Sequence, residues 1–111
     1  MKVLFIVLNK TEQLDALLLA LSDAGIKGAT IVHSTGMARA LIGHGESPLI
    51  SSLRLLLDPS REENRTIFTL VKDEQVPVVK QVLETVVGDL QAPDTAILFT
   101  IPVEDIEGVK F

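Results

Sequence analysis

Two apolar runs constrain this chain more than any other feature of its sequence. Residues 3–8 (VLFIVL) and residues 96–99 (AILF) contain no polar side chain. A strand points alternate side chains to opposite faces of its sheet, so a strand with water on one face shows polar residues at every second position. Both faces of these strands must therefore be covered in the folded protein.

The two runs belong to a set of four segments, rich in β-branched residues, that are predicted as strands. These segments are residues 3–8, 29–33, 66–71 and 95–103. Four leucines between residues 14 and 21 recur at helical spacing after the first strand, and Gly25 follows them. Apolar residues between 76 and 87 repeat this pattern after the third strand, with Asp73 as the predicted N-cap and Gly88 at the exit.

The order strand, helix, strand, long connection, strand, helix, strand predicts an α+β fold of the ferredoxin-like βαββαβ type. We expect a four-stranded antiparallel sheet with two helices on one face, in a single domain over residues 1–111. The second face of that sheet then needs a cover. Further copies of the same sheet in a closed ring are the simplest cover, and we expect a homotrimer, although periodicity alone does not separate three copies from two.

The connection between the second and third strands, residues 34–65, is much longer than a hairpin needs. Ser47 and Pro48 read as an N-cap followed by a proline in the first turn, and the pattern that they start stops at Asp58. The residues at helical spacing between them are Leu49, Ile50, Leu53, Leu56 and Leu57. A short amphipathic helix is predicted there, which either packs on its own oligomer or offers Leu49, Leu53 and Leu56 to a partner.

The overall composition excludes several classes of protein. The formal net charge is −5 and the ten basic residues are scattered, which argues against nucleic-acid binding. Cysteine is absent, so the chain has no disulfide and no thiolate metal site, in keeping with a cytoplasmic location. The apolar start is far too short to span a bilayer and lacks a small-residue cleavage site, so we interpret it as a buried strand.

Three segments of the chain resemble the PII signalling proteins and their PII-like relatives. These segments are residues 20–30 (ALSDAGIKGAT), residues 36–39 (GMAR) and residues 43–44 (GH). The family shows Gly, an aromatic residue, Gly and Arg after its second strand, with Gly-His shortly after, and the order of elements extends the match over nearly the whole chain. The resemblance implies a homotrimeric signalling protein of the kind used in nitrogen regulation, acting on a target such as a membrane transporter or an enzyme.

The resemblance also implies that ATP, ADP or another small effector binds in clefts between subunits, beside a loop that touches the target. The ligand-binding residues predicted on this basis are Gly36, Met37, Ala38, Arg39, Gly43, His44, Gly88 and Asp89. Gly36 would allow close backbone approach and Arg39 would supply a fork of donors, the alternative being a strand exit with a solvated arginine.

The ATP site of the family is incomplete in this chain. The Gly-rich, Lys-containing phosphate loop is replaced by residues 88–94 (GDLQAPD), and the arginines after the last strand are missing. Each lost charge-assisted hydrogen bond is worth about 1.5–3 kcal/mol. We therefore expect ATP to bind weakly or not at all, and a less charged effector to fit better. The chain also has no tyrosine that could be uridylylated.

No enzyme is expected, because the sequence has no nucleophile elbow, no GxxxxGK[ST] phosphate loop and no metal-ligand cluster. His33, His44 and Glu46 have the right chemistry for a metal ion, but their spacing is typical of ordinary polar roles, and no metal site is predicted. An alternative is a CutA-like divalent-cation tolerance protein, also a ferredoxin-like trimer, although the chain lacks the aromatic-rich strands expected of one. A purely structural assembly module without a ligand is the third possibility.

Overall fold

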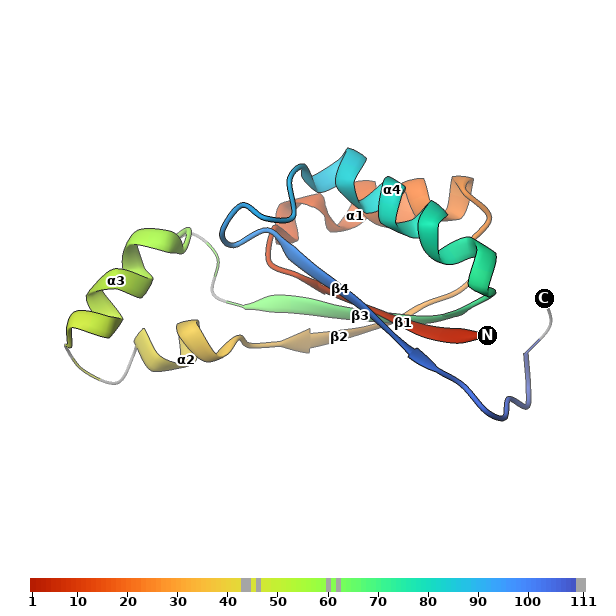
Figure 1. Cartoon of the computed structure of the whole chain (residues 1–111). Helices are drawn as coiled ribbons and strands as arrows, with labels where there is room; N and C mark the ends of the chain where they lie inside the picture. The colour runs from red at the N-terminus through yellow and green to blue at the C-terminus, as the bar shows by residue number, and fades with distance from the viewer. Residues whose placement is uncertain (43–44, 46, 60, 62, 110–111) are drawn as a thin grey trace.

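The computed structural model describes the chain except for residues 43–44, 46, 60, 62 and 110–111. The described part is an α+β arrangement of strands and helices (Figure 1). In chain order its elements are β1 (Lys2–Leu8), a 3₁₀ turn (Thr11–Gln13), α1 (Leu14–Asp23), β2 (Thr30–Ser34), α2 (Met37–Ile42), α3 (Pro48–Leu56), β3 (Asn64–Val71), a second 3₁₀ turn (Asp73–Gln75), α4 (Val76–Val87) and β4 (Ala96–Pro102). The four strands and three of the helices match segments predicted from the sequence.

The strands form one antiparallel sheet in the order β2-β3-β1-β4. β1 pairs with β3 along its whole length, with Lys2 opposite Val71 and Leu8 opposite Arg65, and with β4 on its other side. β3 thus lies between β1 and β2, and β1 lies between β3 and β4. The helices α1 and α4 each connect two strands across the intervening one, and both lie on the same side of the sheet in Figure 1.

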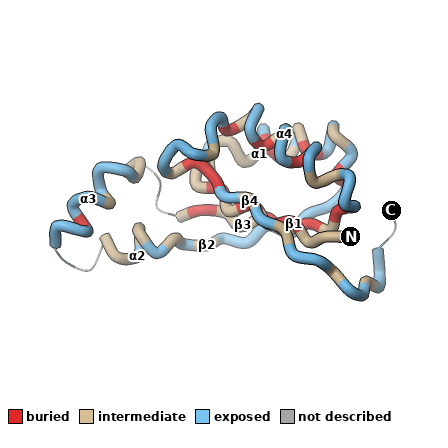
Figure 2. Tube along the Cα trace, in the orientation of Figure 1, coloured by how far each residue is buried: buried red, intermediate tan, exposed pale blue. Residues whose placement is uncertain are grey.

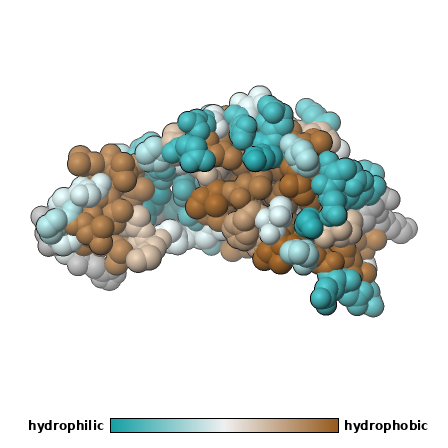
Figure 3. Space-filling view, viewed as in Figure 1, coloured by the Kyte–Doolittle hydropathy of each residue, from teal (hydrophilic) through white to brown (hydrophobic). Residues whose placement is uncertain are grey.

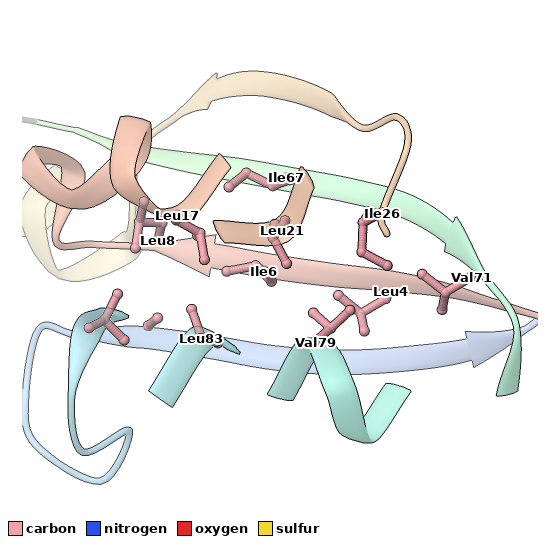
Figure 4. Packing of buried hydrophobic residues seen from close by; sticks show 12 residues of the cluster. Leu4, Ile6, Leu8, Leu17, Leu21, Ile26, Ile67, Val71, Val79 and Leu83 are labelled. Atoms are coloured by element: carbon pink, nitrogen blue, oxygen red, sulfur yellow. The ribbon is translucent and has the colours of Figure 1, made fainter. Parts of the chain in front are cut away.

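The hydrophobic core lies between this side of the sheet and the two helices α1 and α4 (Figure 4). Alternate residues of β1 and β3 point into it, as the strand period requires. The buried members are Leu4, Ile6, Leu8, Leu17, Leu21, Ile26, Ile67, Val71, Val79, Leu83, Val87 and Ala96. We call the four strands with α1 and α4 the body.

The helix ends agree with two of the predicted signals and correct one. Gly25 and Gly88 follow α1 and α4 with φ of 93° and 90°, a backbone region that favours glycine. Asp73, however, does not cap α4. Its carboxylate pairs with the N-terminal amine at 3.0 Å, since the start of β1 lies beside the end of β3, and a 3₁₀ turn leads into the helix instead. The hydrogen bond from this amine, with the charge of Lys2, lowers the pKa of Asp73.

The other side of the sheet, which we call the open face, is apolar across its strands. Its apolar side chains, placed on one face by the strand register, are Val3, Phe5, Val7, Val32, Phe68, Leu70, Ile97, Phe99 and Ile101. The same register adds the polar residues Thr30, Ser34, Asn64 and Thr66, all on β2 and β3. Phe5 stacks on Phe99 with ring centroids 4.8 Å apart, and its centroid lies 5.8 Å from that of Phe68. Phe99 is still 43% exposed, and the outer strands are exposed along much of their length (Figure 2). The predicted apolar second face is therefore present, and no helix in the part of the chain that the structure describes lies over it (Figure 1).

Between β2 and β3 the chain leaves the sheet and forms the helices α2 and α3, which pack on each other beyond the end of the sheet (Figure 1). We call residues 37–61 the arm. Ser47 starts α3 as predicted, its Oγ accepting a hydrogen bond from the Ile50 N–H at 3.2 Å, and Pro48 occupies the first turn. The sequence did not predict α2, because its six residues are too few to establish a helical period.

None of the helices in the part of the chain that the structure describes is both long and apolar enough to cross a bilayer.

Candidate functional site

Arg39, the one cation among the predicted ligand-binding residues, faces Asp94 in the loop before β4. Its Nη1 donates to Asp94 Oδ1 at 2.9 Å and its Nη2 to Oδ2 at 2.8 Å, while its Nε donates to the Arg61 carbonyl oxygen at 2.7 Å. The two side chains are only 8% and 4% exposed. The fork of donors that the sequence offered to a ligand is therefore held by a carboxylate of the same chain.

The far end of the arm reaches the same carboxylate. The Asp58 N–H donates to Asp94 Oδ2 at 2.9 Å, and Arg61 Nη1 donates to Oδ2 at 3.1 Å and to the Asp94 carbonyl oxygen at 3.0 Å. Arg61 Nη2 also donates to Glu12 Oε2 at 2.9 Å, beside the start of α1. We call these five residues the Asp94 cluster. Both ends of the arm are fastened through it to the body.

The environment of the cluster favours the charged forms of Asp94 and Arg61. Burial alone would raise the pKa of Asp94, but hydrogen bonds from Arg39 and the Asp58 N–H, with the charges of both arginines, lower it below its ordinary value. Burial likewise opposes the charge of Arg61, yet hydrogen bonds and charges of Glu12 and Asp94 raise the pKa of Arg61. Asp94 is also the only non-glycine residue with positive φ, 59°, in the described part of the chain. Aspartate tolerates this conformation better than most residues do.

A cavity of about 640 Å³ opens where the chain entering β2 separates from β3. Lys27 and Lys72 line it together with Phe68, Leu70 and the backbone of residues 25–29. Neither lysine forms an ion pair with another described residue. This volume lies in the range of small-molecule sites, and two free ammonium groups beside an aromatic ring suit a small organic anion.

The structure places the predicted ligand-binding residues in separate locations. Gly88 and Asp89 line a cavity of about 450 Å³ beside the end of α4, whereas Arg39 lines another of about 510 Å³ within the arm, next to Arg54 and Leu57. None of these three cavities of the described residues contains both sets.

The described members Gly36, Met37 and Ala38 do not line either of these two cavities. Met37 is 78% exposed at the start of α2, and Ala38 is half-buried beside it. A Cβ on Gly36 would lie 3.5 Å from the Asn64 side chain, an ordinary contact, so the backbone there does not require glycine. Gly43 and His44 lie outside the described residues.

His33 is exposed on β2, with Nδ1 3.3 Å from Glu63 Oε1. The hydrogen bond with His33, followed by the charge of Arg65, lowers the pKa of Glu63. Within the part of the chain that the structure describes, no three His, Cys, Asp or Glu side chains gather as metal ligands, and His44 and Glu46 lie outside that part.

The arm exposes several large apolar side chains (Figure 3). Leu49 is 61% exposed and Leu56 is 55% exposed, whereas Leu53 is half-buried and Ile50 is buried. Two of the three residues predicted to bind a partner are therefore accessible. Leu55, which the sequence pattern did not select, is 88% exposed. The sequence could have indicated the exposure of Leu55, because this leucine lies outside the apolar stripe of an amphipathic helix. We call Leu49, Leu55 and Leu56 the arm leucines.

No protein-family model matches the chain, and no curated protein is significantly similar to it in sequence. The chemistry of the site therefore has to be inferred from its own residues.

Proposed function

We propose that this protein is a homotrimeric regulatory protein of the PII-like kind, which senses a small effector and acts on a partner protein through its arm. The observation that carries this proposal is the division of exposed apolar surface between two places, the open face of the sheet and the arm leucines. Large exposed apolar surfaces on a folded protein usually mark interaction sites. Two separate surfaces suit two different partners.

We assign the fold to the ferredoxin-like type. In the strand order β2-β3-β1-β4, β3 lies between the two strands of the β1-α1-β2 unit, and β1 lies between the two strands of the β3-α4-β4 unit. This order supports a pair of split βαβ units. The position of α1 and α4 on one side of the sheet is consistent with this assignment (Figure 1).

The open face is the surface for self-association. It carries three phenylalanines and six aliphatic side chains without a charged residue, so its burial against identical faces would remove a large apolar area from water. A closed ring of three copies covers every open face, whereas an isolated chain leaves all of them in water. Arm leucines remain free for a different protein, such as a transporter or an enzyme.

The effector is a small organic anion that binds in the cavity between Lys27 and Lys72. The charge of the two lysines attracts the anion, and Ile26, Ala29 and Val109, which lie off the open face, offer an apolar wall to the rest of the molecule. ATP fits this site poorly, because two lysines balance only part of a triphosphate. Arg39 adds nothing, since Asp94 neutralises it. A cytoplasmic location suits a sensor of this kind.

The proposal is tested by two measurements on the purified chain. Light scattering should give three times the 12.0 kDa of one chain at micromolar concentration, and a mass of one chain would contradict the proposal.

The effector is tested by a thermal-shift screen with ATP, ADP, AMP, cyclic dinucleotides and small mono- and dicarboxylates. We expect a small anion to raise the melting temperature of the protein more than ATP does. The double variant Lys27→Gln and Lys72→Gln should lose the shift, whereas Lys80→Gln, on the outside of α4, should keep it. Low-micromolar ATP affinity by calorimetry would overturn the effector assignment.

A further inference from the structure

The arm is joined to the body by charged groups rather than by apolar packing. The hydrophobic core cluster contains none of the described residues of the arm, and Ile50 is the one buried hydrophobic residue among those of α2 and α3. At the arm's base, by contrast, the Arg39 side chain is 8% exposed and the Arg61 side chain 13% exposed, and both contact Asp94. The orientation of the arm relative to the body therefore depends on polar contacts that involve this carboxylate.

Asp94 itself is held firmly by the body. The carbonyl oxygen of the next residue, Thr95, accepts hydrogen bonds from the N–H groups of Asn9 and Lys10 at 2.9 and 3.1 Å, where β1 ends. Thr95 is buried and begins the approach to β4. The carboxylate of Asp94 thus projects from a fixed point of the sheet toward the two ends of the arm.

We propose that Asp94 is the positioning residue of the arm, which sets the direction in which the arm leucines face a partner. The role of those leucines in partner binding rests on the proposed function, whereas the orientation of the arm does not. Removing the negative charge of Asp94 would leave two nearly buried guanidinium groups with Glu12 and Asp58 as the remaining acids in the cluster. Both of these acids pair with Arg61, so the Arg39 guanidinium would be left buried without an acid partner among the described residues. A buried charge without a partner is costly, so the base of the arm would open to water and the arm would swing.

The arrangement also explains the departure of residues 88–94 from a phosphate-binding loop. An aspartate at position 94 repels phosphate but pairs with Arg39 and Arg61 from the arm. This loop of the chain is therefore built to hold the arm, and Asp94 adopts a left-handed backbone conformation to do so.

The test measures the arm's position directly. The chain has no cysteine, so cysteines placed at Leu55 on the arm and Leu19 on α1, both highly exposed, accept spin labels specifically. Pulsed electron spin resonance then gives the distribution of arm-to-body distances, with labelled chains diluted in unlabelled ones so that each oligomer carries one labelled copy. Asp94→Asn is compared with Asp89→Asn, which removes the same charge from an exposed position in the same loop. Asparagine also tolerates positive φ, so the backbone requirement is preserved.

We expect one narrow distance distribution for the parent chain and for Asp89→Asn, and a broad or two-component distribution for Asp94→Asn. Amide exchange in α2 and α3 should accelerate roughly tenfold or more in Asp94→Asn, while exchange in β1 and β3 stays unchanged. An unchanged narrow distribution in Asp94→Asn would overturn the proposal. If Asp94→Asn does not fold, Arg39→Gln tests the same ion pair from the arm, and an unchanged distribution there has the same meaning. Neither readout requires a partner or an effector, so failure of the proposed function would leave this result intact.

Discussion

The body and the arm are stabilised by different forces. The body buries twelve hydrophobic side chains between the sheet and two helices, and its strands pair residues far apart in the sequence. The arm buries Ile50 and depends on Arg39, Arg61 and Asp94 at its base. Because apolar burial is non-directional and charge pairing is specific, the body sets stability and the arm's base sets orientation. Changes in the two regions should therefore have separable effects.

The largest effect is expected from a cavity in the body. Ile6→Ala removes a fully buried side chain from the middle of β1, and such a change typically costs about 2–5 kcal/mol of unfolding free energy. Denaturant unfolding followed by circular dichroism measures the loss. Leu55→Ala in the arm is the control, and we expect it to change the free energy of unfolding by no more than about 0.5 kcal/mol. Equal losses in the two variants would remove the distinction between body and arm.

A second effect is expected on assembly rather than on folding. Phe99→Lys places an ammonium group on the open face beside Phe5, where burial against another copy would require its desolvation. Light scattering should show the mass of one chain, with the far-ultraviolet spectrum unchanged. Leu19→Lys adds the same charge to the outer side of α1 and should leave the trimer intact. A Phe99→Lys trimer as stable as the parent would rule out the open face as the interface.

A local effect is expected when Leu53 and Leu56 are both replaced by serine. A helix of nine residues is too short to persist alone in water, so α3 needs its contacts with α2. Hydrogen exchange should then rise across residues 34–65, while the trimer and its melting temperature stay nearly unchanged. Leu55→Ser, at a fully accessible position, should leave exchange in α3 close to that of the parent. Loss of the trimer in the double variant would place these leucines in the core of the assembly.

The smallest effect is expected from acid. Because the pKa of Asp94 is lowered in the folded protein, its carboxylate contributes its full stabilisation at pH values above 3.8, the pKa of the unfolded state. This contribution is lost as the pH falls below 3.8 and through the folded-state pKa. The distribution of arm-to-body distances should therefore stay constant between pH 8 and pH 5 and broaden below pH 3.8. Asp94→Asn should lack this acid transition. Glu63→Gln is the control, because Glu63 is the other carboxylate near the arm with a lowered pKa, and this variant should keep the transition. An equal transition in Asp94→Asn would assign it to another group.

Local signals in the sequence were sufficient for most of the fold. The apolar runs at residues 3–8 and 66–71, the leucine spacing after the first strand, and the Ser47-Pro48 start each depend on neighbours within a few positions. They predicted β1, β3, α1 and α3, and they also predicted an apolar second face for the sheet. The N-cap assigned to Asp73 failed, because a distant group, the amine of the first residue, competes for its carboxylate.

The candidate site depended on tertiary structure. Arg39 and Asp94 are 55 positions apart in the sequence, and Lys27 and Lys72 line the same cavity from different segments of the chain. No local spacing in the sequence connects the members of either pair. The sequence identified Arg39 as a candidate ligand-binding cation and residues 88–94 as a segment that lacks the family's phosphate loop. Only the folded chain determines that each is the partner of the other, because an ion pair requires two groups at contact distance. The strand pairing places the end of β2 and the start of β4 at the same end of the sheet, on opposite edges, and α2 carries Arg39 from one toward the other.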